Sequence, residues 1–261
     1  MDMKLTGKTA LVLASSSGLG KAIATELVKE GANVMLTSRS ADKLEEAKKD
    51  ILKTATGKVD YTVADITDAE SIKNLVESTR NTFGPISILV NNAGGPPSGT
   101  FEDFDDADWQ KAFDLTLFSF IRTIRAVLPD LKETGGHILN NASSSIKQPI
   151  DGLTLSNVFR MGISGLSKSL SQELAPHHIL VNTIGAGRIE TERLVQLDAA
   201  KAEKQGKTQQ EVTDQIEQSI PLGRYGQPEE FAKTAVFLVS GANTYLTGQN
   251  ILIDGGMVKS Y

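Results

Sequence analysis

The chain has 261 residues, which is enough for one large α/β domain with a buried core. It contains no cysteine, so disulfide bonds and thiolate chemistry are excluded, and we expect a cytoplasmic location. The formal net charge of −5 comes without a basic stripe and argues against nucleic acid as the main partner. No segment approaches ~18 continuous apolar residues, so we expect neither a signal peptide nor a membrane span.

The first 39 residues predict a strand, a turn of small residues, a helix and a second strand. Thr9–Leu13 is a short apolar run, and Ala14–Gly20 follows with small residues and a single leucine. Apolar residues then recur every four positions, as in an amphipathic helix, before the strand Asn33–Ser38. Such a turn exposes backbone N–H groups at a positively polarised helix N-terminus, so it predicts a phosphate site.

Strand-like and helix-like patterns alternate through the rest of the chain. The predicted strands are Val59–Val63, Ile86–Val90, Ile138–Asn141 and Ile179–Ile184, and two long helices cover about Asp105–Leu128 and Leu155–Leu174. This alternation predicts one α/β domain over residues 1–261, a Rossmann-like doubly wound parallel sheet of about seven strands. We expect helices on both faces and ligands at the carboxyl ends of the strands.

Three short motifs resemble the short-chain dehydrogenase/reductase family. The first turn, Ala14-x-x-x-Gly18-x-Gly20, is similar to the family's T-G-x-x-x-G-x-G, with alanine at the first glycine position. Asp65 follows the third strand, as does the family aspartate that holds adenine, and Asn91–Gly94 resembles the family's N-N-A-G turn. Alanine leaves room for a phosphate if its backbone angles are negative. Further motifs extend the resemblance over nearly the whole chain.

The resemblance implies a dinucleotide cofactor, and the end of the second strand indicates which one. In such folds an acidic residue there binds the ribose 2′-OH of NAD, whereas arginine accommodates the additional phosphate of NADP. Ser38 occupies the acidic position and Arg39 follows, so the sequence favours NADP(H) over NAD(H). The complete set of expected cofactor-binding residues is Ala14, Ser16, Ser17, Gly18, Leu19, Gly20, Ser38, Arg39, Asp65, Asn92, Ala93, Gly94, Arg160, Gly187, Ile189 and Thr191.

The resemblance also places the family's four catalytic positions, and three of them are changed. Ser143 is retained, but Ser156 stands where the family has tyrosine and Arg160 where it has lysine. Thr116 stands at the position of the family asparagine. The downstream stretch Gly165–Ala175 matches without a gap and gives the same alignment. In the family the tyrosine donates a proton to the developing alkoxide, and the lysine lowers its pKa.

The altered residues change the chemistry that we expect. A serine hydroxyl is not acidic near neutral pH and arginine stays protonated, so neither replaces the tyrosine as a proton donor. Arg160 can instead bind ribose hydroxyls or a substrate carboxylate or phosphate, and its charge can stabilise an oxyanion. Water, Lys147, Arg188 and Glu190 are alternative proton donors. We find no spacing of histidine, aspartate and glutamate that predicts a metal site.

Three functions remain open from the sequence. The first is an atypical NADP(H)-dependent oxidoreductase that transfers hydride to or from a carbonyl or hydroxyl of a small molecule, for example one of 3-oxoacyl type. The second is a non-catalytic NADP-binding sensor or subunit, and the third is a cofactor-using lyase or epimerase. The resemblance further implies a helical substrate lid over residues 193–220, broken at Gly206, and a homodimer or homotetramer paired through the two long helices.

Overall fold

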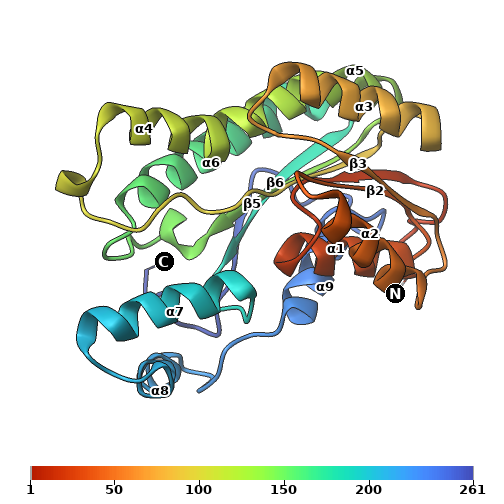
Figure 1. Ribbon diagram of the computed structural model, residues 1–261. Coiled ribbons are helices and arrows are strands. Elements are labelled where there is room, and N and C mark those ends of the chain that lie inside the picture. The colour runs from red at the N-terminus through yellow and green to blue at the C-terminus, as the bar shows by residue number, and fades with distance from the viewer. Residues whose placement is uncertain (1, 261) are drawn as a thin grey trace.

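The computed structural model describes residues 2–260, and a seven-stranded parallel sheet forms its centre (Figure 1). The strands lie in the order β3-β2-β1-β4-β5-β6-β7. In chain order they are β1 (Thr9–Val12), β2 (Asn33–Ser38), β3 (Val59–Val63), β4 (Ile88–Asn91), β5 (Gly136–Ser143), β6 (Ile179–Ala186) and β7 (Asn250–Ile253). The predicted fold class is therefore confirmed.

Helices cover both faces of the sheet (Figure 1). One layer holds α1 (Gly18–Lys29), α2 (Ala41–Leu52) and α9 (Pro228–Leu238), and the other holds α3 (Ala69–Phe83), α4 (Asp106–Phe113), α5 (Ser119–Thr134) and α6 (Thr154–Glu173). The helices α7 (Glu192–Gln205) and α8 (Gln209–Ser219) lie beyond the sheet. Short 3-10 turns span Phe101–Asp103, Ser144–Ile146 and Ala175–His177.

The strands are buried on both faces because a helical layer packs on each side. All four residues of β1 are buried, and such continuous runs are typical of parallel sheets. One apolar core lies against α1, α2 and α9, and a second lies against α3, α5 and α6. Each fully buried Leu, Ile or Phe contributes roughly 1.5–3 kcal/mol through the hydrophobic effect.

The order of the strands determines where a ligand can bind. From β1 the chain builds towards β3 on one side, then crosses to β4 and builds towards β7 on the other. Ligands of doubly wound sheets bind at this reversal point, in the crevice outside the carboxyl ends of the strands. The turn after β1 and the loop after β4 flank that crevice.

The first long helix differs from its prediction. The expected continuous helix over Asp105–Leu128 is divided into α4, a π-turn over Asp114–Phe118 and α5, and α5 extends to Thr134. A π-turn inserts one residue and so rotates the apolar face that follows it by about 100°, but here apolar residues cover much of the circumference, and periodicity could not reveal the shift.

The two helices beyond the sheet agree with the predicted helical stretch 193–220. Gly206 ends α7 with a positive φ of 63°, which is the left-handed conformation that glycine adopts at low cost. A separate apolar cluster that includes Leu194, Val212 and Ile216 holds α7 and α8 together. They therefore form a small unit packed on its own core at the edge of the crevice.

Candidate active site

A cavity of about 600 Å³ lies at the carboxyl ends of the strands. The turn after β1, the ends of β2, β3 and β5, the loop after β4, α6 and the start of α7 form its walls. Of the residues that the sequence assigned to the site, all except Gly20 and Thr116 line this cavity. The fold thus brings together residues from Ala14 to Thr191.

The turn after β1 is shaped to receive a phosphate group. Ser17 precedes α1 in an extended conformation, and its side chain makes no capping hydrogen bond, so the first N–H groups of α1 are free. A Cβ atom on Gly20 would collide with the Ala14 carbonyl oxygen and lie 2.7 Å from Nδ2 of Asn92. Glycine is therefore required for this close packing, and the turn fits a dinucleotide pyrophosphate.

Ala14 adopts a backbone conformation that the sequence did not predict. Its φ is +47°, in the left-handed region, so the condition of negative backbone angles, set above for alanine to leave room for a phosphate, is not met. The Asn92 side chain donates a hydrogen bond to its carbonyl oxygen at 3.1 Å, and the next residue, Ser15, donates its N–H to Thr37 at 2.9 Å. These contacts hold the alanine in a conformation that favours glycine.

The far end of the cavity carries the residues expected to bind the adenosine part of the cofactor. Two hydrogen bonds from Thr67, at 2.8 and 2.7 Å, fix the Asp65 carboxylate and lower its pKa. Arg39 is exposed and forms no ion pair with any residue in the range 2–260. Its guanidinium is free to meet a phosphate.

Arg160 lies at the inner wall of the cavity and is only 7% exposed. Its Nη1 donates to the carbonyl oxygen of Asn141 at 2.7 Å and its Nη2 to that of Ala93 at 3.5 Å, while Nε has no partner within the described part of the chain. Burial lowers the pKa of Arg160 to about 10, so the side chain remains a cation at neutral pH. It is a buried charge without a carboxylate partner.

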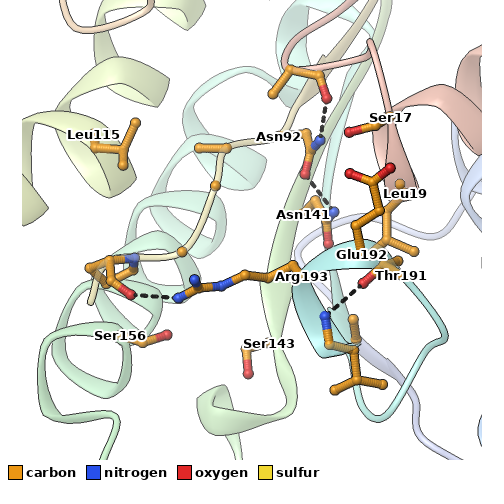
Figure 2. A pocket seen from close by; sticks show the side chains of 18 of the residues that line it. Ser17, Leu19, Asn92, Leu115, Asn141, Ser143, Ser156, Thr191, Glu192 and Arg193 are labelled. Carbon is orange, nitrogen blue, oxygen red and sulfur yellow. Dashed lines mark hydrogen bonds between the residues drawn. The ribbon is translucent and has the colours of Figure 1, made fainter. Parts of the chain in front are cut away.

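A chain of hydrogen bonds connects Arg160 to the turn after β1, and Figure 2 shows its Asn141 and Asn92 links. Asn141, whose carbonyl binds Arg160, donates its side-chain amide to Asn92 at 2.8 Å, and Asn92 donates in turn to the carbonyl of Ala14 at 3.1 Å. Arg160 and the turn after β1 are therefore parts of one polar network.

The fold brings three of the four expected catalytic positions to the cavity. Ser143 ends β5, and its hydroxyl accepts a hydrogen bond from the Ser145 N–H at 3.2 Å. Ser156 lies on α6 and is 8% exposed. Thr116 lies on the π-turn, is fully buried and does not line the cavity, and its Oγ has no hydrogen-bond partner among residues 2–260.

None of the alternative side-chain proton donors lines the cavity. Arg188 binds the Asp198 carboxylate at 3.0 Å, and the Glu190 carboxylate accepts a hydrogen bond from Gln227 at 2.8 Å. Lys147 also lies outside the lining residues. Of the alternative proton donors expected from the sequence, water remains.

Two charged residues at the start of α7 belong to the cavity but were not predicted from the sequence. Glu192 and Arg193 both line the cavity, and Figure 2 shows the Glu192 carboxylate pointing toward Ser17. Arg193 extends across the cavity, and its Nη2 donates to the Pro96 carbonyl at 3.1 Å. Their position directly after Thr191 was the feature of the sequence that could have indicated a place in the site. We did not assign them to it because charged residues in a polar helix usually face solvent.

Neither a metal site nor a membrane-spanning helix is found in the part of the chain that the structure describes. No group of three or more histidine, aspartate or glutamate side chains over residues 2–260 is arranged to hold a metal ion. Over the same residues, no helix has the length and apolar character needed to cross a membrane.

Comparisons with known proteins identify relatives over the full length of the chain. Residues 13–258 match the family described as Enoyl-(Acyl carrier protein) reductase. The chain is 32% identical over 258 residues to 3-oxoacyl-(acyl-carrier-protein) reductase FabG from Aquifex aeolicus, covering 98% of this chain and 100% of that protein.

Two solved structures share its fold closely. L-Sorbose reductase from Gluconobacter frateurii, complexed with NADPH and L-sorbose, has a TM-score of 0.95 and 33% identity, with both chains covered completely. An NADPH-bound short-chain oxidoreductase from Pseudomonas aeruginosa PAO1, which contains an atypical catalytic centre, has a TM-score of 0.89 and 31% identity over 99% of both chains. Both structures contain NADPH, in agreement with the cofactor predicted from Arg39. Because fold, cavity and full-length matches agree, the chain belongs to the short-chain dehydrogenase/reductase family.

Proposed function

We propose that the protein is an NADP(H)-dependent oxidoreductase that transfers hydride to or from a carbonyl or hydroxyl carbon of a small molecule. The observation that carries this proposal is the cavity itself, which runs from Arg39 past the turn after β1 to Ser143. The NADPH-bound relatives support the choice of cofactor.

The residues of the cavity divide into parts that suit each portion of the cofactor. The free N–H groups at the start of α1 bind the pyrophosphate, and Arg39 binds the 2′-phosphate. Asp65 holds the adenine end, and Thr191 closes over the turn, since its methyl group would lie 3.7 Å from a Cβ on Gly18. When bound, NADPH supplies the hydride.

Ser143 and Arg160 act on the reacting carbonyl. The carbonyl carbon accepts the hydride, and the electron pair of the C–O π bond moves to the oxygen, to which Ser143 donates a hydrogen bond. The buried cation of Arg160 stabilises the negative charge that develops there. A water molecule then gives the alkoxide its proton and leaves as hydroxide.

A non-catalytic NADP-binding sensor is the second candidate. The observation that favours it is the position of Arg160, whose guanidinium is bound to the carbonyl groups of Asn141 and Ala93. In that case Arg160 ties the loop after β4 to strand β5 and has no role in a reaction.

Calorimetric titration with NADPH and NADH tests the proposed cofactor, with Arg39→Ala as the informative variant. We expect NADPH to bind more tightly than NADH. The variant should lose about 10- to 100-fold in NADPH affinity and keep its NADH affinity, because a hydrogen bond to a charged group contributes about 1.5–3 kcal/mol. Binding of neither cofactor would contradict the proposal.

Turnover separates the oxidoreductase from the alternatives. If the protein oxidises NADPH in the presence of a carbonyl substrate, and Ser143→Ala abolishes this activity, the oxidoreductase is supported. Cofactor binding without turnover across a broad set of carbonyl compounds supports the sensor. Conversion of a substrate with no net change in NADPH supports a lyase or epimerase.

A further inference from the structure

The arginines of this protein fall into two groups. Of the eight arginines in the sequence, four form ion pairs: Arg80 with Asp130, Arg122 with Asp114, Arg188 with Asp198 and Arg224 with Glu230. The other four have no such pair within residues 2–260, and three of them, Arg39, Arg160 and Arg193, line the cavity. The unpaired guanidinium groups are therefore concentrated at the site.

The cofactor accounts for only one end of this arrangement. Arg39 lies beside Ser38 and Asp65 at the end assigned to the adenosine phosphate. Figure 2 shows Arg193 near Ser143 and Ser156 at the other end, and Arg160, which also lines the cavity, follows Ser156 by one turn of α6. Two cations therefore remain where the substrate has to bind.

The side chain of Arg193 is held in place across the cavity (Figure 2). Its Nη2 donates to the carbonyl of Pro96, 97 residues away along the chain, and would lie 3.9 Å from a Cβ on Gly95. This contact uses one of the five N–H donors of the guanidinium and leaves the others available. Arg193 thus has a defined position and free binding capacity.

No carboxylate of the cavity wall neutralises these two cations. The acidic residues among the lining residues are Asp65, which is bound by Thr67 at the adenine end, and Glu192, which points toward Ser17. The other lining residues include the apolar or small Leu115, Leu153 and Gly94 and the uncharged amides of Asn141 and Gln196. Arg160 is buried, so its uncompensated charge is costly there and favours an anionic ligand, while Arg193 is exposed and offers its free N–H donors to the same ligand.

We propose that the substrate carries a carboxylate, that Arg193 binds it, and that the protein acts on small oxo acids or the matching hydroxy acids. This inference rests on the proposed oxidoreductase function. The planar fork of a guanidinium matches a carboxylate in a bidentate geometry, and Arg160 adds a second positive charge to the same region. A neutral sugar or thioester would leave both cations without a counter-charge.

Matched pairs of ligands test the inference on the NADPH-bound protein. We would titrate 2-, 3- and 4-oxo acids, each beside its methyl ester, and measure binding by calorimetry. We expect at least one acid to bind tenfold or more tightly than its ester. Arg193→Gln should weaken that acid by about 10- to 100-fold and leave the ester unchanged, whereas Arg193→Lys should retain part of the preference.

A control variant shows whether the effect belongs to the cavity. Lys201 is an exposed cation on the same helix, α7, but does not line the cavity, so Lys201→Gln should change neither affinity. Acids that bind no better than their esters would overturn the inference, and so would an acid preference that survives in Arg193→Gln. Phosphonates that bind in preference to every matched acid would overturn the carboxylate assignment.

The two proposals fail in distinguishable ways. Every variant would also be titrated with NADPH, and Arg193→Gln should bind it like the unaltered protein. Intact NADPH binding without an acid preference rejects the oxo acid and leaves the oxidoreductase standing. If the unaltered protein does not bind NADPH, the oxidoreductase is rejected. The acid and ester pairs are then titrated into the cofactor-free protein, and the same criteria decide whether Arg193 forms an anion site.

Discussion

Ala14 occupies a backbone position that suits glycine, at the start of the turn that we assign to the cofactor pyrophosphate. Its φ of +47° costs an L-residue with a Cβ atom about 1–2 kcal/mol relative to the right-handed region. The hydrogen bond from Asn92 to its carbonyl keeps it there. The strain is therefore maintained by the same asparagine network that reaches Arg160.

Replacement of this alanine should stabilise the protein. We expect Ala14→Gly to raise the free energy of unfolding by about 0.5–1 kcal/mol, since relief of strain exceeds the entropy that glycine adds to the unfolded chain. Urea unfolding measures the change. Ala22→Gly in α1 is the matched control and should lower stability, because glycine is unfavourable within a helix. A loss of stability in Ala14→Gly would contradict the strain.

The helix α7 is held to the body of the protein by a buried polar cluster. Asp198 on α7 is 2% exposed, binds Nη1 of Arg188 at 3.0 Å and accepts a hydrogen bond from the Tyr225 hydroxyl at 2.8 Å. Burial, followed by the neighbouring Asp198 carboxylate, raises the pKa of Tyr225, so its hydroxyl stays protonated and continues to donate. The start of α7 carries Arg193, so this cluster also fixes the proposed anion site.

Removal of the Asp198 carboxylate should therefore loosen α7 and α8. Asp198→Ala leaves a partly buried guanidinium without its partner, and breaking a buried pair in this way costs roughly 3–5 kcal/mol. Because the pair belongs to a peripheral unit, we expect the loss of local stability to appear as faster hydrogen exchange and proteolysis within residues 192–219. Asp198→Asn retains an acceptor for Tyr225 and should have a smaller effect. Unchanged exchange in Asp198→Ala would show that the apolar cluster alone holds α7.

The outer surface of the α4 and α6 layer carries apolar side chains that the chain itself does not cover. Val158 and Met161, at i and i+3 on α6, are 48% and 52% exposed, and Phe101 nearby in the chain before α4 is 71% exposed. Exposed apolar patches of this kind mark interaction surfaces. We expect two copies of the chain to pair through this layer, in a homodimer or as part of a homotetramer.

Charged substitutions on α6 test this assembly. Val158→Glu combined with Met161→Glu should reduce the sedimenting species to a monomer, because two carboxylates would be buried at the interface. Leu52→Glu is the control, since Leu52 is 51% exposed on α2 in the opposite layer. A double variant that sediments like the unaltered protein would place the interface elsewhere.

Much of the architecture was accessible from the sequence because it depends on local patterns. Apolar runs predicted every strand from β1 to β6 within a few residues, four-residue periodicity predicted the helix after β1, and Gly206 marked the break between α7 and α8. Those predictions succeed because hydrophobic period and glycine conformation act over a few neighbouring residues. The π-turn that contains Thr116 escaped them because apolar residues cover much of the helix circumference around it.

The sequence by itself determined the family resemblance and the order of strands and helices along the chain, and it supplied the alignment by which we expect Ser143, Ser156 and Arg160 at the catalytic positions. These follow from spacing within single segments of chain. Only the tertiary structure decided the left-handed angle at Ala14 and the reach of Arg193 to the Pro96 carbonyl. Both depend on side-chain directions and on contacts between segments far apart in the chain, which no local period encodes.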